Sequence, residues 1–183
     1  MVERAATQGS MSVEDYLEME KTATVRHEYL AGEVYAMTGA SRRHNRIAGN
    51  AYRRLADAAA GGPCRIYMET VKLRIDDVFY YPDVMVACDE EPDDPYYEDD
   101  PYLVVEVVPP STEGTDRREK LAAYKRIPGL KAYLIVDQDR TRVERHFRDE
   151  EGVWLRADLV DEGRFSVPCP ETSLTLAEIY EGL

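Results

Sequence analysis

Cysteine is scarce in this chain, and long apolar runs are missing. The 183 residues include three cysteines, Cys64, Cys88 and Cys169, which lie far apart and form no C-x-x-C pair. An odd and scattered set of this kind favours reduced structural thiols over a disulfide framework or a zinc knuckle. No apolar run approaches the roughly 20 residues of a membrane span, and residues 1–10 lack the apolar core of a signal peptide. We therefore expect a cytoplasmic protein with no membrane partner.

The short motifs of several enzyme classes are absent as well. The chain has no P-loop, no G-x-G-x-x-G and no G-x-S-x-G. These absences argue against nucleotide hydrolysis, dinucleotide binding and nucleophilic-triad chemistry. We expect no organic cofactor.

Positive charge is scarce overall but locally concentrated. The net charge is −13, and eight acids lie between residues 89 and 100; without those eight charges the net charge would be −5. Excess negative charge argues against a nucleic-acid ligand, because phosphate contacts need local positive charge. Basic residues nevertheless cluster within 42–54, 117–126 and 140–148. Each cluster fits either a basic binding face or an ordinary solvated surface.

Length and hydrophobic patterning predict one folded domain. The chain is 44% hydrophobic, and we expect a disordered lead at 1–11 followed by a single domain at 12–183. Periodicity predicts helices at 13–20, 43–60, 116–126 and 174–181 and strands at 26–30, 33–37, 65–68, 71–75, 78–87, 103–108, 132–137, 141–148 and 153–159. The strand, helix and strand from 103 to 137 have short connections, which favours a right-handed crossover with parallel strands. The predicted fold class is α/β (α+β), a mixed central β-sheet flanked by helices with a peripheral C-terminal hairpin and helix.

Two carboxylates interrupt the most strand-like runs, Asp83 within 78–87 and Glu106 within 103–108. An ionised carboxylate in an apolar run is costly to bury unless a cation or a hydrogen-bond donor receives it. If the strands are adjacent, both acids could bind one hard divalent cation, which supports phosphodiester cleavage. The alternatives are a turn aspartate for Asp83 and a structural ion pair for Glu106.

Three further side chains, and one of two acids, are candidates for the same site. Lys120 and Tyr124 share a helix face and could reach the end of the Glu106 strand, although a helical lysine is commonly a surface residue. His44 begins the long helix, where backbone amides favour phosphate, but a lone histidine there can also be a capping or surface residue. Glu28 and Glu33 flank a predicted hairpin turn, and spacing does not choose between them as a third acidic ligand or an exposed acid.

Six motifs occur in a specific order and spacing, at 27–33, 41–45, 81–84, 105–107 with 111–113, 116–124 and 133–137. Together they resemble the Uma-type putative restriction endonuclease family of the PD-(D/E)XK nuclease superfamily. The resemblance extends over residues 12–183 and implies a restriction-endonuclease-like core. It further implies that Pro82-Asp83 is the PD element, Glu106 the second acid and Glu28 the acid ahead of the sheet.

The resemblance also implies Mg²⁺ as cofactor, with Mn²⁺ as a substitute, DNA as the substrate and a homodimer. This chain departs from the superfamily pattern at Val108, which stands where the superfamily has its lysine, two positions after Glu106. Lys120 resembles a migrated substitute for that lysine. A second departure is Pro109, where relatives carry a small polar residue.

Three functional hypotheses follow, from different classes. The first is a Mg²⁺-dependent DNA endonuclease in which Asp83, Glu106 and Glu28 hold the metal, Lys120 positions water, and His44 and Tyr124 contact phosphate or shape the site. The second is a catalytically silent DNA-binding or protein-interaction module, with the acidic segment 89–101 as a partner surface. The third is a glycosidase, which would need two carboxyl groups about 5 to 9 Å apart in a sugar cleft.

Overall fold

The strand, helix and strand predicted between residues 103 and 137 form the centre of the fold. The computed structural model describes residues 10–109 and 115–183, and β8 (Leu103–Val108) and β9 (Ala132–Asp137) are parallel neighbours joined through α3 (Thr115–Tyr124). All but the last residue of each strand is buried, as expected for strands covered on both faces. The predicted crossover is confirmed.

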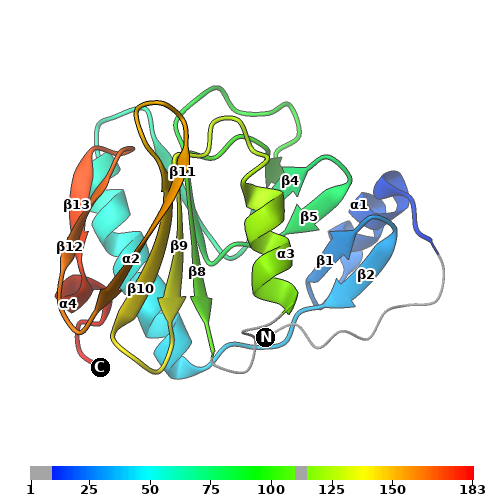
Figure 1. Cartoon of the computed structure of the whole chain (residues 1–183). Coiled ribbons are helices and arrows are strands. Elements are labelled where there is room, and N and C mark those ends of the chain that lie inside the picture. Colours follow the sequence, from blue (N-terminus) through cyan, green and yellow to red (C-terminus); the bar gives the residue numbers. More distant parts are fainter. Residues whose placement is uncertain (1–9, 110–114) are drawn as a thin grey trace.

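These two strands belong to a six-stranded mixed sheet (Figure 1). The strand order is β11-β10-β9-β8-β6-β3, and every neighbouring pair other than β8 and β9 is antiparallel. The remaining members are β3 (Arg65–Met68), β6 (Val84–Ala87), β10 (Arg142–Arg148) and β11 (Trp154–Val160). The β6–β8 register pairs Val84 with Val105, and this register sets the positions of the two acids considered below.

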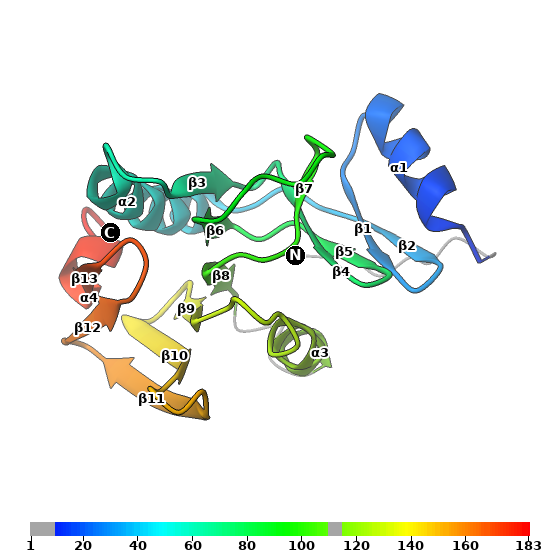
Figure 2. The ribbon, with the colours of Figure 1, turned by 90° about the horizontal axis from the view of Figure 1, so that it is seen from above.

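Two helices cover opposite faces of the central sheet, as Figure 2 shows. α2 (Arg42–Ala59) packs Ile47 and Leu55 into the same core as Val105. α3 packs Tyr124 into a second core, which contains Val104. Successive residues of a strand point to opposite faces, so β8 contributes to both cores. The fold is therefore the predicted mixed α/β arrangement.

A second, five-stranded sheet lies beside the central one and carries α1 (Val13–Thr22). Its order is β2-β1-β5-β4-β7, formed by β1 (His27–Leu30), β2 (Glu33–Ala36), β4 (Lys72–Ile75), β5 (Val78–Tyr80) and β7 (Tyr97–Glu98). Tyr16 of α1 stacks on Tyr29 of β1 and packs on Phe79 of β5. Buried aromatic side chains therefore hold α1 against this sheet.

The single strand expected at 78–87 is wrong, because the chain leaves one sheet and enters the other within it. β5 ends at Tyr80, β6 begins at Val84, and the two strands belong to different sheets. Pro82 lies between them, and proline lacks the amide hydrogen that a continuous central strand needs. As a result, Asp83 lies where the two sheets meet.

The closing helix expected at 174–181 is confirmed but is shorter than expected. β12 (Arg164–Val167) and β13 (Thr172–Thr175) form an antiparallel hairpin, and α4 covers only Leu176–Ile179. Thr175 and Glu178 form a reciprocal capping box that starts α4. Leu174 and Leu176 are buried in the main core from two different elements, so burial alone does not mark where the strand ends and the helix begins.

The expectation of three cysteines far apart from one another is also wrong. The Sγ atoms of Cys64, Cys88 and Cys169 lie together. The reason is long-range strand pairing: β3 and β6 pair Arg65 with Ala87, so the residues just beyond them, Cys64 and Cys88, lie opposite each other.

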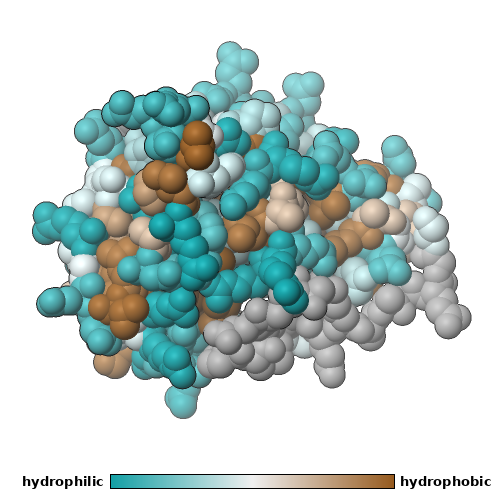
Figure 3. Space-filling view, viewed as in Figure 1, coloured by the Kyte–Doolittle hydropathy of each residue, from teal (hydrophilic) through white to brown (hydrophobic). Residues whose placement is uncertain are grey.

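The face of the molecule in Figure 3 is mostly hydrophilic, with apolar side chains in several separate patches. None of the helices in residues 10–109 and 115–183 is both long enough and apolar enough to cross a membrane. Residues 1–9 of the expected disordered lead, and the motif residues 111–113, lie outside the described part of the chain.

Candidate active site

The six side chains predicted for the site come from four elements and the junction between the sheets. Asp83 precedes β6, Glu106 lies in β8 and Glu28 in β1. His44 lies in the first turn of α2, and α3 carries the remaining two, Lys120 and Tyr124. They form two groups: one contains Glu28, Glu106, Lys120 and Tyr124, and the other contains Asp83 and His44.

The first group, here the lysine group, consists of Glu28, Glu106, Lys120 and Tyr124. Lys120 Nζ lies 2.9 Å from Glu28 Oε1 and 3.3 Å from Glu106 Oε1. Tyr124 donates its hydroxyl hydrogen to the same Glu106 oxygen at 2.6 Å. All four residues are buried, so the carboxylates depend on the ammonium and the hydroxyl and not on bulk water.

Burial raises the pKa of Glu106 to about 7, and the negative charges of Asp83 and Glu28 add to this effect. The Lys120 ammonium and the Tyr124 hydrogen bond act in the opposite direction, because both favour the carboxylate. Burial and the Glu106 charge raise the pKa of Tyr124 well above its usual value, so Tyr124 stays a hydrogen-bond donor. Glu106 is thus a carboxyl group whose ionisation depends on a neighbouring cation.

Asp83 lies between the lysine group and His44, and it contacts both the backbone of β8 and the His44 ring. Its Oδ2 accepts the Val107 backbone N–H at 2.6 Å and lies 3.2 Å from His44 Nε2. The pairing of Val84 with Val105, extended by one residue, places Asp83 opposite Glu106. The sheet therefore brings the two predicted acids to neighbouring positions, as the sequence hypothesis requires.

The N-terminal cap of α2 positions His44. Ser41 Oγ accepts the His44 backbone N–H at 3.1 Å, which starts the helix at this point. Burial lowers the pKa of His44, but the hydrogen bond to Asp83 and its negative charge outweigh that effect and leave the pKa raised. Among the described residues, His44 Nδ1 is buried without a hydrogen-bond partner.

Glu69 belongs to the site and was not foreseen from the sequence. Ligand atoms of His44, Glu69 and Asp83, here the histidine group, lie within 4.8 Å of one another. Glu69 follows β3, whose register pairs Met68 with Val84, and it therefore lies opposite Asp83. The missing signal was the β3–β6 pairing, which no local pattern in the sequence reveals. The metal set of Asp83, Glu106 and Glu28 stays a prediction, because the histidine group contains Asp83 but neither Glu106 nor Glu28.

The structure separates the two hairpin acids that the sequence left open. Glu28 is 2% exposed and contacts Lys120, whereas Glu33 is exposed on β2 and accepts a hydrogen bond from Tyr35. Only Glu28 of the two lies in the lysine group.

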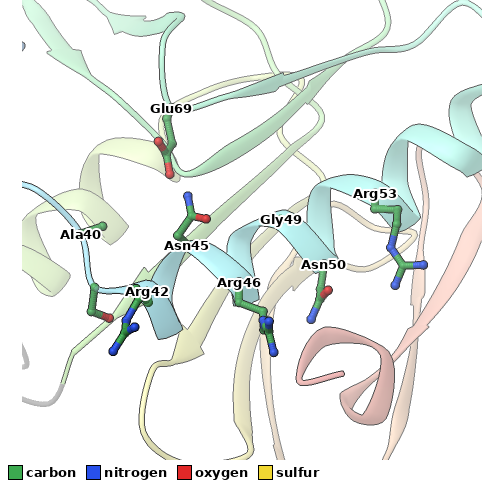
Figure 4. A pocket seen from close by; sticks show the side chains of 9 residues that line it. Ala40, Arg42, Asn45, Arg46, Gly49, Asn50, Arg53 and Glu69 are labelled. Carbon is green, nitrogen blue, oxygen red and sulfur yellow. The ribbon is translucent and has the colours of Figure 1, made fainter. Parts of the chain in front are cut away.

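A groove of about 710 Å³ runs along α2 and reaches Glu69 (Figure 4). Arg42, Arg46 and Arg53 line it together with Asn45. In Figure 4 the side chains of Asn45 and Glu69 point toward one another across the groove. The groove therefore carries positive charge along the helix and an acid at the end nearest the histidine group.

The mixed α/β fold is shared with a solved structure. A crystal structure described as a putative nuclease belonging to DUF820, from Anabaena variabilis ATCC 29413, superposes with a TM-score of 0.75. The match covers 93% of this chain and 97% of that chain at 14% sequence identity, which shows a shared fold.

The chain belongs to the Uma2 family, described as putative restriction endonuclease, whose sequence profile matches residues 13–177. It is 32% identical over 176 residues to the uncharacterized protein slr1290 of Synechocystis sp. (strain ATCC 27184 / PCC 6803 / Kazusa), covering 94% of this chain and 93% of that protein. It is also 32% identical over 166 residues to the uncharacterized protein sll1609 of the same strain, covering 86% of this chain and 92% of that protein. The family resemblance found in the sequence motifs is confirmed.

Proposed function

We propose that this protein is a Mg²⁺-dependent endonuclease that hydrolyses phosphodiester bonds of DNA. The observation that carries the proposal is the position of Lys120, whose ammonium lies within 3.3 Å of both Glu28 and Glu106 although it comes from the helix after β8. This position supports the hypothesis that Lys120 replaces the lysine of the superfamily pattern, whose place on the strand is taken by Val108. Family membership supports the reaction class.

The donor set fits a hard divalent cation. Carboxylate oxygens of Asp83, Glu106 and Glu69 are the ligand type that Mg²⁺ and Mn²⁺ prefer. Burial raises the pKa of Glu106, so this side chain gains more from a nearby cation than an exposed acid would. A bound Mg²⁺ would polarise a phosphoryl oxygen and lower the pKa of a bound water.

The side chains around the acids would hold and orient the reacting groups. The Lys120 ammonium contacts the Glu28 and Glu106 carboxylates, so it would lie beside a water or a phosphate oxygen that these acids and a bound metal hold. Tyr124 fixes Glu106 through its hydroxyl, and His44 fixes Asp83 through Nε2. His44 Nδ1 retains hydrogen-bonding capacity that a phosphate or a water could use.

The α2 groove is the proposed path of the DNA backbone. Arg42 and Arg46 can each neutralise a phosphate, whereas Arg53 is paired with Glu181, and the groove ends beside Glu69 at the histidine group. The acidic segment 89–100 lies outside the groove lining and accounts for much of the net charge of −13. Arg42→Ala should weaken DNA binding. It should also make the negative slope of log affinity against log salt concentration shallower by about 0.9, because one phosphate contact is lost.

A plasmid-nicking assay with supercoiled DNA tests the proposal. With Mg²⁺ or Mn²⁺, the wild-type chain should convert the plasmid to open-circular or linear forms, and Asp83→Asn and Glu106→Gln should not. Glu28→Gln should lower the rate strongly. Glu33→Gln removes the same charge from the exposed end of the same hairpin and serves as the matched control, which should stay active.

Calorimetric titration with Mg²⁺ gives a second readout that does not depend on turnover. The wild type should show saturable binding that Asp83→Ala weakens. Identical titration curves for the two proteins would rule out Asp83 as a metal ligand and with it the proposed mechanism.

A catalytically silent nuclease-fold module is the second candidate. The observation that favours it is that Lys120 already pairs with both Glu28 and Glu106, so one buried cation offsets part of their charge without a metal. Binding of plasmid DNA without metal-dependent nicking would support this candidate. The glycosidase hypothesis gives no role to Lys120, and we do not carry it further.

We also propose that the protein forms a homodimer. Sedimentation equilibrium at micromolar concentration should give twice the mass of 20.9 kDa. A single species of 20.9 kDa across that range would contradict it.

A further inference from the structure

The three cysteines converge at the opposite end of the β3–β6 pair from the proposed nuclease site. Cys64 immediately precedes β3, Cys88 immediately follows β6, and Cys169 lies in the turn between β12 and β13. The Cα atoms of Cys64 and Cys88 are 4.0 Å apart, and those of Cys88 and Cys169 are 7.5 Å apart. The Sγ atoms of Cys64 and Cys169 lie 3.0 Å apart, and that of Cys88 contacts both.

A disulfide accounts for two of these sulfurs but not for the third. One sulfur forms one disulfide, so a covalent pair would leave the remaining cysteine as a thiol in contact with it. All three Sγ atoms instead lie within 4.8 Å of one another, so the three side chains can supply ligand atoms to one ion. Thiolate sulfurs are soft ligands, which favour Zn²⁺ and Cd²⁺ over Mg²⁺.

We propose that Cys64, Cys88 and Cys169 form a three-thiolate site for one Zn²⁺ ion. Each cysteine is half-buried, so one side of the cluster faces solvent and leaves the fourth tetrahedral position to a water. Binding replaces the thiol protons with the metal and releases them to solvent, so zinc affinity rises with pH.

The site is separate from the proposed Mg²⁺ site in position and in ligand chemistry. Asp83 and Cys88 are five residues apart at the two ends of β6, which corresponds to about 16 Å along an extended strand. Oxygen ligands lie at one end and sulfur ligands at the other, so each end favours a different metal.

The zinc ion would join three segments that are distant in sequence. Cys64 and Cys88 pack against the main core, which also contains Phe165, Val167 and Leu174 of the β12–β13 hairpin. Cys169 lies between Pro168 and Pro170, whose rings restrict the backbone on both sides of the ligand. Metal binding would therefore fix the C-terminal hairpin to the edge of the central sheet.

Titration of the reduced, metal-free full-length chain with Cd²⁺ tests the proposal. Thiolate-to-cadmium charge transfer in the ultraviolet should saturate at one ion per chain, and Zn²⁺ should displace it. Cys169→Ser should weaken binding by about 100-fold or more because one of three ligand bonds is lost. Asp83→Asn should leave the titration unchanged, since it alters only the other end of β6.

A labelling experiment on the native chain keeps the test independent of whether the serine variants fold. Zn²⁺ should protect all three cysteines from alkylation, as counted by mass spectrometry, and a chelator should expose them. Cd²⁺ binding that Cys169→Ser leaves intact, or three cysteines that alkylate equally with and without Zn²⁺, would overturn the site. A disulfide between any two cysteines in a reductant-free preparation, together with no Cd²⁺ band after reduction, would overturn it as well.

Discussion

Lys120 reaches its two carboxylates from a helix, although the superfamily pattern expects a lysine on the strand itself. Tyr124 lies one turn further along α3 and contacts the same Glu106 oxygen, so the helix supplies two donors to one acid. The ammonium also lies 5.2 Å from the centre of the Tyr80 ring, which is within range of a cation–π interaction. The position of the charge is therefore set by several contacts and not by Glu106 alone.

Lys120→Met should abolish nicking while leaving DNA binding within a few-fold of wild type. Loss of a residue that stabilises charge in the transition state typically costs about 10²–10³ in rate. Lys120→Arg keeps the charge with a different shape and should restore part of the activity if the charge is the main contribution. Equal nicking rates for wild type and Lys120→Met would contradict a catalytic role, and gel-based plasmid assays measure both quantities.

His44 and Asp83 form the other interaction whose effect can be measured at a single residue. Asp83 holds the pKa of His44 above its usual value of 6.5 against the effect of burial. Asp83→Asn should therefore lower the pKa of His44, which NMR titration of the ring C–H signals measures. Glu144→Gln, next to the other buried histidine, is the control and should leave His44 unchanged.

The same pair predicts the sign of a pH effect on stability. A histidine with a raised pKa in the folded state contributes stability that is fully present below about pH 6.5 and lost as pH rises through the folded pKa. Between pH 6.5 and the raised pKa of His44, the amount by which wild type is more stable than Asp83→Asn should decrease as the pH rises. A difference that is constant over this range would show that the pair does not contribute in this way.

Among the elements, α2 connects folding to the site. Its first turn contains His44, and its exposed side carries the arginines of the groove. Ser41 Oγ caps the helix and also contacts Gln138 beyond the end of β9, which ties the helix start to the central sheet.

Ser41→Ala should lower the unfolding free energy by about 1 kcal/mol, because the His44 backbone N–H loses its cap. Urea unfolding followed by circular dichroism measures the change. Ser173→Ala, on the exposed side of β13, is the matched control and should stay within about 0.5 kcal/mol of wild type. Equal losses for both variants would contradict the capping role.

For the whole molecule, stability depends on two cores on opposite faces of one sheet. Leu134 of β9 is 1% exposed in the core under α2, and Tyr133 beside it lies in the core under α3. The two sheets meet at Asp83, so the candidate site forms only when both sheets are in place.

Leu134→Ala should lower the unfolding free energy by about 2 to 5 kcal/mol through the cavity it leaves. Val153→Ala, at a position that is 52% exposed, should change it by less than about 0.5 kcal/mol. Thermal unfolding of the two variants beside wild type provides the comparison. A loss at Val153 as large as that at Leu134 would contradict this description of the core.

Several features of the fold were predictable because their signals are local. The length of α2 followed from helical spacing that ends at Gly61, and the β8–α3–β9 crossover followed from β-branched runs with short connections. The strand at 78–87 was wrong and the helix at 174–181 was too long, because each prediction combined residues of two elements. In both cases the buried residues pack into the structure from different strands or helices, which periodicity alone does not distinguish.

The sequence by itself determined the types of element, the family and the two acids that interrupt apolar strands. The tertiary structure decided which residues meet. The β3–β6 pairing illustrates the difference, since it brings Glu69 opposite Asp83 at one end and Cys64 opposite Cys88 at the other. Side-chain periodicity is a local property of the chain, whereas strand pairing depends on the register between segments that are distant in sequence.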